Sequence, residues 1–155
     1  MFHFKKSPAF TILELLIVIA IVSIMAGVSV YSLSISRTAT RDAKRISDIS
    51  VIRAALSQYW LLKAVYPPGE QVYLGKAGSG ADRLSNIGFA SQSEAAETIF
   101  LDRIPTPPTV NEYYLYTGNM QGYSLKFTME RASAYGKAGV WYAHTTGVDG
   151  EDIAK

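Results

Sequence analysis

The stretch "SPAFTILELLIVIAIVSIMAGV", residues 7–28, decides the fold. After Pro8 its residues are apolar or small, apart from two hydroxyl residues and the carboxylate of Glu14. The 22 residues from 15 to 36 contain no charge. At 1.5 Å per residue they would form about 33 Å of helix, which is enough to cross the hydrocarbon core of a bilayer. The stretch therefore predicts a membrane-spanning helix with one acidic residue near its start.

Two ordinary explanations of this stretch remain open. A secretory signal peptide would use Lys5 and Lys6 as its basic region and would be cut near residues 27–29. Its apolar region would normally be 7–15 residues long, which is shorter than the run seen here, and would not contain a glutamate. A plain single-span anchor that is never cut is the second explanation.

A third explanation accounts for the whole pattern. A short basic leader ends at Ala9, and the run Phe10-Thr11-Ile12-Leu13-Glu14 then opens a continuous apolar segment. This pattern resembles the N-terminus of type IV pilins and of type II secretion pseudopilins. The resemblance implies that a prepilin peptidase cuts between Ala9 and Phe10, and that the new amino group of Phe10 is N-methylated. Many pilins have a proline near the middle of this helix, and this chain has none there.

The charge of Glu14 fits the third explanation. A carboxylate within a bilayer costs roughly 2.5–3.5 kcal/mol on insertion scales, and this cost needs a compensating interaction. No lysine or arginine lies between Lys6 and Arg37. Cleavage before Phe10 would create an α-amine that is largely protonated at neutral pH. We therefore predict that Glu14 is an assembly charge whose partner is the amine of Phe10 in its own chain or in a neighbouring subunit.

The helix is predicted to continue beyond the membrane, to about residue 63. Apolar residues recur there at helical spacing, and the charged residues Arg45, Asp48 and Arg53 fall elsewhere on the helical wheel. Two prolines, at positions 67 and 68, end the pattern because proline cannot continue a helix. Residues 27–36 are poor helix formers, so we expect them to be helical in lipid and partly extended in a filament. The apolar stripe consists of Ile46, Ile49, Ile52, Leu56 and Tyr59, followed by Lys63.

The rest of the chain predicts a small antiparallel sheet. Residues 93–102 carry a serine followed by acidic residues, which predicts a short helix. Residues 112–117, 123–130 and 140–145 predict three strands, with a hairpin loop at residues 118–122. The fold class is therefore α+β and pilin-like, with one long N-terminal helix packed on the sheet. Three parts are expected: a leader (1–9), a transmembrane and assembly half of the helix (10–36), and a globular domain (37–155).

The residue types argue against an enzyme. The chain has no cysteine, and its two histidines are His3 in the leader and His144, which we expect on the surface of a strand or packed beneath it. No nucleophile motif surrounds any serine. Residues 75–80, "GKAGSG", lack the ending of a phosphate-binding loop. We therefore expect no catalytic residue and no cofactor.

The sequence also argues against binding of a metal ion or of nucleic acid. Asp149, Glu151 and Asp152 have no EF-hand spacing, so a solvated acidic tail is preferred to a calcium site, and no metal ligand is assigned. The net charge is +2, and Lys5 and Lys6 account for both units, which gives no general case for binding nucleic acid. Capture of DNA by the monomer is therefore not expected.

The predicted function is that of a structural subunit. It would leave the cytoplasmic (inner) membrane, where it is single-pass with its C-terminal domain outside, and enter an extracellular or periplasmic filament. The resemblance implies a homo-oligomeric filament, a prepilin peptidase and an inner-membrane assembly platform as partners, with membrane lipid as the environment before assembly. The alternatives are an uncleaved membrane-anchored binding module and a DNA-uptake (competence) pilin.

Overall fold

A computed structural model describes residues 10–155, and residues 1–9, which are predicted to be a leader, lie outside the described residues. One long helix, α1 (Ile12–Lys63), is followed by eight short strands. The chain divides into two compact units between Arg37 and Thr38, and each unit is described separately below. The helix predicted for residues 10–63 is thus confirmed, although it begins two residues later than expected.

The end of α1 is set by its backbone as well as by the prolines. Ala64 adopts a left-handed conformation with φ of 55°, and its amide donates a 2.6 Å hydrogen bond to the carbonyl of Trp60. A left-handed residue directly after the last helical residue is a common way to end a helix. Pro67 then follows three residues beyond Ala64, where it prevents the helix from resuming.

The first unit is the apolar half of α1. Its large side chains are exposed, and its length and composition are sufficient to cross a membrane. The hydroxyls of Ser23 and Ser29 donate to the carbonyls of Ile19 and Met25, at 2.7 and 2.8 Å. These bonds leave both hydroxyls satisfied within the helix, which an apolar surrounding requires.

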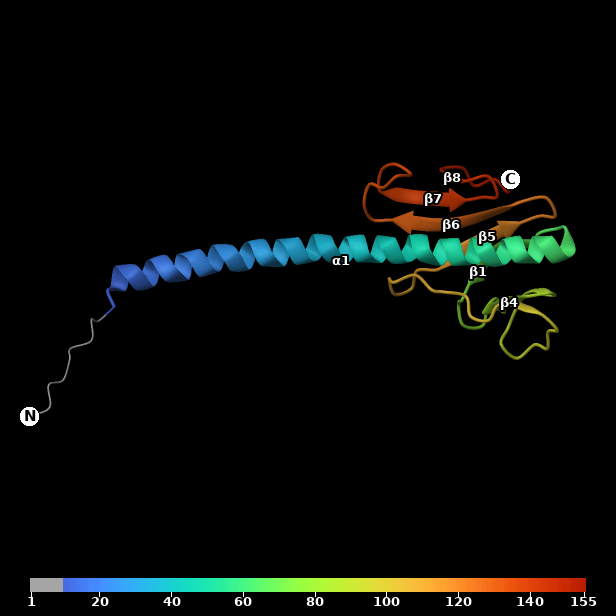
Figure 1. The fold of residues 1–155 in the computed structure, drawn as a ribbon, viewed down its shortest axis with the longest axis horizontal. Coiled ribbons are helices and arrows are strands. Elements are labelled where there is room, and N and C mark those ends of the chain that lie inside the picture. Colours follow the sequence, from blue (N-terminus) through green and yellow to red (C-terminus); the bar gives the residue numbers. More distant parts are fainter. Residues whose placement is uncertain (1–9) are drawn as a thin grey trace, which may run out of the picture. The chain divides into compact units, whose positions relative to one another are not determined.

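The second unit contains two antiparallel sheets. The larger sheet has the order β1-β5-β6-β7-β8, and the smaller has the order β3-β2-β4. The two sheets lie along the C-terminal half of α1 (Figure 1). The strands of the larger sheet are β1 (Gly69–Leu74), β5 (Tyr114–Gly118), β6 (Tyr123–Met129), β7 (Gly139–Ala143) and β8 (Val148–Asp149). Those of the smaller sheet are β2 (Arg83–Ser85), β3 (Gly88–Ala90) and β4 (Ile99–Leu101).

The predicted three-strand meander is confirmed by β5, β6 and β7. Each pairs antiparallel with the next, in a register that sets Tyr116 opposite Leu125 and Phe127 opposite Trp141. The strands β1 and β8 extend this sheet on either side and were not expected from the sequence.

The helix predicted at residues 93–102 is wrong. This segment forms turns and then β4, in which Leu101 pairs with Leu84 of β2. The ring of Phe100 meets that of Tyr59 on α1, edge to face, with centroids 5.9 Å apart. Because β4 is a strand, the adjacent side chains of Phe100 and Leu101 lie on opposite faces of the small sheet, where both can be packed. That tertiary gain outweighs the local signal of a serine followed by acidic residues.

The hydrophobic core lies between α1 and the sheets. It is formed by the predicted stripe of α1 together with the inward side chains of the strands. Tyrosines contribute much of it. The ring of Tyr116 meets that of Phe89 edge to face at 4.7 Å and stacks on that of Tyr123 at 6.1 Å. The fold class predicted from the sequence is therefore confirmed.

The expected position of two charged residues on α1 is wrong. Arg45 and Asp48 were placed away from the apolar stripe, yet their exposed fractions are only 2% and 8%. Asp42 is buried as well. These residues have polar partners on distant segments, and those partners make up for the water that the charges lose.

Candidate assembly site

The N-terminal motif forms the first turn of α1. Phe10 is exposed and precedes the helix, and the side chain of Thr11 caps it. Oγ1 of Thr11 accepts a 3.2 Å hydrogen bond from the amide of Glu14, and the carbonyl of Thr11 accepts one of 3.2 Å from the amide of Leu15. A threonine at the cap with a glutamate three residues later is a known signal for a helix start. This signal was present in the sequence and was missed.

The cap gives Glu14 a local role. A carboxylate in the first turn interacts favourably with the partial positive charge of the helix N-terminus. Phe10 and Glu14 lie four residues apart, a spacing that corresponds to about one helical turn. Ala9 lies outside the described residues. The roles of Ala9 and Phe10 in cleavage, and of Glu14 in assembly, therefore stay predictions.

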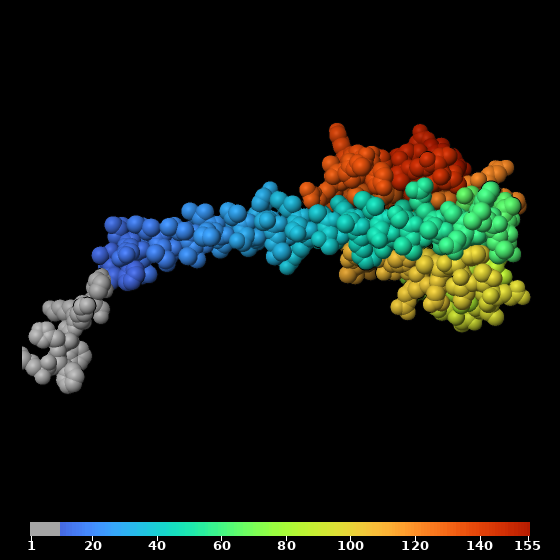
Figure 2. Space-filling model, in the orientation of Figure 1, coloured from blue at the N-terminus to red at the C-terminus, as the bar shows by residue number. Residues whose placement is uncertain are grey.

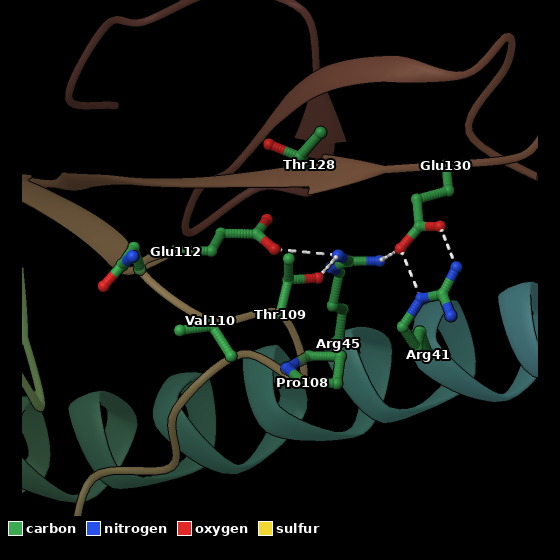
Figure 3. A pocket seen from close by; sticks show the side chains of 9 residues that line it. Arg41, Arg45, Pro108, Thr109, Val110, Glu112, Thr128 and Glu130 are labelled. Atoms are coloured by element: carbon green, nitrogen blue, oxygen red, sulfur yellow. Dashed lines mark hydrogen bonds and ion pairs between the residues drawn. The ribbon is translucent and has the colours of Figure 1, made fainter.

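A second cluster of charged residues lies in the globular unit, around Arg45 (Figure 3). Nη1 of Arg45 lies 2.9 Å from a carboxylate oxygen of Asp42 and 2.7 Å from one of Glu130. Nη2 donates to Glu112 at 2.8 Å and to the hydroxyl of Thr109 at 2.7 Å. One buried guanidinium thus joins α1 to the end of β6 and to the segment before β5.

Glu130 is shared between two arginines. Arg41 donates to both of its carboxylate oxygens, and Arg45 donates to one of them. The hydrogen bonds from Arg41, followed by those from Arg45, lower the pKa of Glu130 from 4.5 to about 2. The backbone amide of Glu130 in turn donates to Asp42 at 3.0 Å.

The ion pairs of this cluster connect α1 to other segments of the globular unit. A groove of about 680 Å³ opens beside it, lined by Arg41, Arg45, Glu112, Glu130 and the segment 108–111. The arginines and glutamates of the groove already pair with one another. The pairing holds the connection between the two sheets against α1. Asp42 and Arg45 are three residues apart, a spacing at which the sequence could have shown the pair.

His144 is packed, which confirms one of the two expected positions. It follows the last residue of β7, and its side chain is fully buried. Nδ1 lies 3.1 Å from the carbonyl oxygen of Tyr123, and Nε2 lies 3.0 Å from Oδ1 of Asp149. Both contacts are accounted for by packing, and no serine hydroxyl is among the hydrogen-bond partners of the ring.

The sequence predicts a solvated acidic tail at Asp149, Glu151 and Asp152, but in the structure all three carboxylates have partners. Nζ of Lys155 lies 2.7 Å from Asp149 and 2.9 Å from Glu151, and Asp152 accepts a 2.7 Å hydrogen bond from Ser124. The bond from Lys155 is the largest cause that lowers the pKa of Asp149 to about 2. Among residues 10–155, no group of three or more histidine, aspartate or glutamate residues is placed to hold a metal ion.

Comparison with known proteins agrees with the N-terminal geometry. Residues 4–30 match the model of the prokaryotic N-terminal methylation motif. The type II secretion system core protein G of Aeromonas hydrophila is 28% identical over 127 residues, which are 81% of this chain and 83% of that protein. The protein of the same name from Vibrio cholerae is 28% identical over 117 residues, 74% of this chain and 75% of that protein. No solved structure gave a significant match.

The motif and the two relatives confirm the resemblance seen in the sequence. Together with the long N-terminal helix and the antiparallel sheet, they support the similarity of this chain to type IV pilins and pseudopilins. The chain is a pilin-like protein with a prepilin-type N-terminus.

Proposed function

We propose that this chain is a filament subunit that is cut between Ala9 and Phe10 by a prepilin peptidase and N-methylated at Phe10. The subunit then leaves the cytoplasmic membrane and joins other copies in a helical filament. In this proposal residues 1–9 are the leader, residues 10–36 the transmembrane and assembly half of the helix, and residues 37–155 the globular domain. The globular domain lies outside the cytoplasm, because the leader must face a cytoplasmic peptidase.

One observation carries the proposal. Glu14 lies in the first turn of a helix whose next 22 residues carry no charge and whose large apolar side chains are exposed. A protein that remained in lipid would gain from an apolar residue at this position. A carboxylate is useful there if the helix moves into a filament in which an amine lies at the same depth.

The relatives favour a secretion pseudopilus over other filaments. Both carry the name type II secretion system core protein G, and the chain covers most of their length. The partners proposed on this basis are other copies of the chain, the prepilin peptidase and the inner-membrane assembly platform. A structural role also agrees with the ion pairs around Arg45, in which both Nη atoms of the guanidinium contact carboxylates.

The first experiment is an intact-mass measurement of the protein from its own host. A mature chain that begins at methylated Phe10 is expected. Ala9→Leu should block cleavage, because a larger side chain occupies the position before the cut, whereas Ala9→Gly should be cut normally. A mature mass that still includes residues 1–9, in cells with an active peptidase, would show that this protein is not processed.

The second candidate is an uncleaved, membrane-anchored binding module. The bond between Thr11 and Glu14 favours it to some extent, because helix capping explains an acidic residue at position 14 without assembly. This candidate predicts an intact N-terminus and normal function with any residue at position 14 that keeps the helix start. A DNA-uptake pilin would be cut like a pseudopilin and is separated from it by loss of transformation, rather than of secretion, on deletion.

A further inference from the structure

The larger sheet packs on α1 with one of its two faces. Figure 2 shows the C-terminal half of α1 directly against the strands drawn in orange and red. Tyr116, Leu125 and Ala143, on β5, β6 and β7, belong to the core on this side. Successive side chains of a strand lie on opposite faces of the sheet, so the residues next to them form an outer face. The outer face is open to solvent in part, since Tyr73 is 45% and Val140 44% exposed.

One row of side chains crosses the outer face from β1 to β7. Tyr73 on β1 pairs with Leu115 on β5. Leu115 pairs in turn with Lys126 on β6, and Lys126 pairs with Tyr142 on β7. Residues that pair across antiparallel strands lie on the same face, and neighbouring strands are about 4.8 Å apart. Two tyrosine rings and one ammonium group therefore share a line about 14 Å long.

A second ammonium group lies over the aromatic rings at the β1 edge. Nζ of Lys76 is 4.8 Å from the ring centroid of Tyr73 and 5.7 Å from that of Tyr113. The two rings are nearly perpendicular, with centroids 6.3 Å apart. A contact of this kind holds a cation beside aromatic faces and leaves its charge in place.

The charge of this face is not balanced by carboxylates. Neither Lys76 nor Lys126 forms an ion pair within residues 10–155, and residues 1–9 contain no acid. Asp149, which pairs with Tyr142 at the β8 end of the row, is held by Lys155. The small net charge of the whole chain hides this arrangement, because it averages over every face of the molecule.

We propose that the outer face of the larger sheet binds single-stranded nucleic acid. Bases stack on the rings of Tyr73 and Tyr142, and phosphates contact Lys76 and Lys126. An open sheet face with aromatic side chains is a known platform for two or three unpaired bases, and stacking tolerates any base. A neutral polysaccharide has no use for the two cations, and a polyanion without bases has none for the rings. The inference depends neither on cleavage nor on filament assembly.

Fluorescence anisotropy of the full chain in detergent micelles tests the proposal. The probe is a short labelled oligothymidine, and a duplex of the same length is the comparison. The single strand should bind more tightly, because paired bases cannot stack on the rings. The logarithm of its affinity should fall with the logarithm of the salt concentration with a slope of about −1.4, which is about −0.7 for each of two phosphates.

Substitutions separate stacking from charge. Tyr142→Ala should weaken binding roughly 5- to 150-fold, the range for loss of one stacked base, whereas Tyr142→Phe keeps the ring and should bind like the wild type. Lys76→Gln with Lys126→Gln should remove most of the salt dependence. Lys63→Gln, at the exposed end of α1, is the matched control for the charge and should change nothing. Near-ultraviolet circular dichroism checks that each variant is folded.

Inorganic polyphosphate is the competitor that distinguishes a nucleic acid from a simple polyanion. It should displace the oligonucleotide poorly, because it offers charge without bases. Equal competition by polyphosphate, or full affinity in folded Tyr142→Ala, would overturn the stacking of bases on this face. Binding that survives the double lysine substitution with its salt dependence intact would place the nucleic acid elsewhere. Failure of the wild type to bind the oligonucleotide at low salt would overturn the whole inference, and would leave the proposed function as a filament subunit untouched.

Discussion

The phenol hydroxyl of Tyr114 donates a 2.9 Å hydrogen bond to Oδ2 of Asp48, which lies 66 residues earlier in the chain. Nζ of Lys44 lies 2.6 Å from the same oxygen and also donates to the carbonyl of Thr106 at 2.8 Å. Both Tyr114 and Asp48 are buried. Asp48 thus joins α1 to β5, and Lys44 joins α1 to the segment before β5.

Tyr114→Phe should lower the free energy of unfolding of the globular unit. It removes one hydrogen bond to a buried charged group, which is worth about 1.5–3 kcal/mol. Lys44 remains bonded to Asp48, so the lower end of that range is expected. Urea unfolding in detergent, followed by near-ultraviolet circular dichroism, measures the change. Tyr113→Phe is the matched control, because the hydroxyl of Tyr113 has no hydrogen-bond partner among the described residues. An equal loss in both variants would contradict a role for the bond.

The stability of the globular unit should fall in acid, partly because of Glu130. The pKa of Glu130 is about 2 in the folded chain, below its ordinary value of 4.5, mainly because of the hydrogen bonds from Arg41. A carboxyl group whose pKa is lowered by folding stabilises the fold above its unfolded pKa, and loses that contribution as the pH falls through its folded pKa. The melting temperature should therefore decrease between about pH 4.5 and about pH 2.

Glu130→Gln tests this assignment. The pKa of Asp149 is also about 2, so Asp149 titrates over an overlapping range and the wild-type curve alone cannot identify Glu130. The variant should be less stable at neutral pH and should lose less stability on acidification. Glu97→Gln, at an exposed residue that has no ion pair within residues 10–155, should behave like the wild type. Parallel curves for Glu130→Gln and the wild type would contradict the assignment.

The long helix and the meander could be predicted because their signals are local and repeated. In β6, Tyr123, Leu125, Phe127 and Met129 alternate with more polar residues over a full strand. The smaller sheet could not be predicted in this way. Each of β2, β3 and β4 is three residues long, which is too short for an alternating pattern to stand out.

The burial of two charged residues on α1 was also missed from the sequence. Arg45 lies four residues before Ile49, and Asp48 lies four residues before Ile52, so helical spacing places both charged residues on the apolar face of α1. The sequence prediction that set them elsewhere on the wheel was therefore mistaken. Their burial depends on Glu112 and Tyr114, which lie 67 and 66 residues along the chain. Helical spacing could have indicated that the two residues are buried, but not which distant residues bind them. The cap formed by Thr11 and Glu14 could also have been found, because its spacing was visible in the sequence.

Residues 27–36 should change conformation on assembly. They are helical here, and the hydroxyl of Ser29 is bonded within the helix, as expected for a subunit in lipid. Their intrinsic helix propensity is low, so partial extension becomes accessible once subunits leave the bilayer. A map of the filament should show a local break in the helix at this segment. Unbroken helical density from residue 12 to residue 63 would contradict the prediction.

Gly27→Ala offers a test of the cause. No atom lies within 4 Å of the added Cβ, so the subunit should accept the change. Alanine favours the helix over glycine by roughly 1 kcal/mol, and the break should therefore become shorter or move towards residue 36. If the break is unchanged, helix propensity at position 27 does not determine where it begins.

Glu14→Gln should separate insertion from assembly. The substitution preserves the shape of the side chain and removes its charge, so insertion into the bilayer should be at least as good as in the wild type. Cleavage lies four residues before Glu14 and does not need the carboxylate. The expected result is a processed subunit that remains in the membrane fraction and enters filaments slowly or not at all.

The size of the effect follows from the charge left behind. Removing one member of a buried ion pair typically costs about 3–5 kcal/mol, because the other charge stays uncompensated. In this case that charge would be the α-amine of Phe10, which can lower the cost by losing a proton. The loss for each subunit should therefore lie at or below the lower end of the range. It should grow at lower pH, where the amine stays protonated.

The cap between Thr11 and Glu14 supplies the decisive control. Thr11→Val removes the hydroxyl that accepts from the amide of Glu14, and leaves the carboxylate in place. It should cost about 1 kcal/mol at the helix start, and filaments should still form. Glu14→Gln removes the charge but leaves the hydroxyl and the backbone amide that form the cap. The measurement is the yield of sheared filaments beside the abundance of the subunit in membranes. Normal filaments from Glu14→Gln, together with poor filaments from Thr11→Val, would mean that position 14 serves the helix start rather than an ion pair with Phe10.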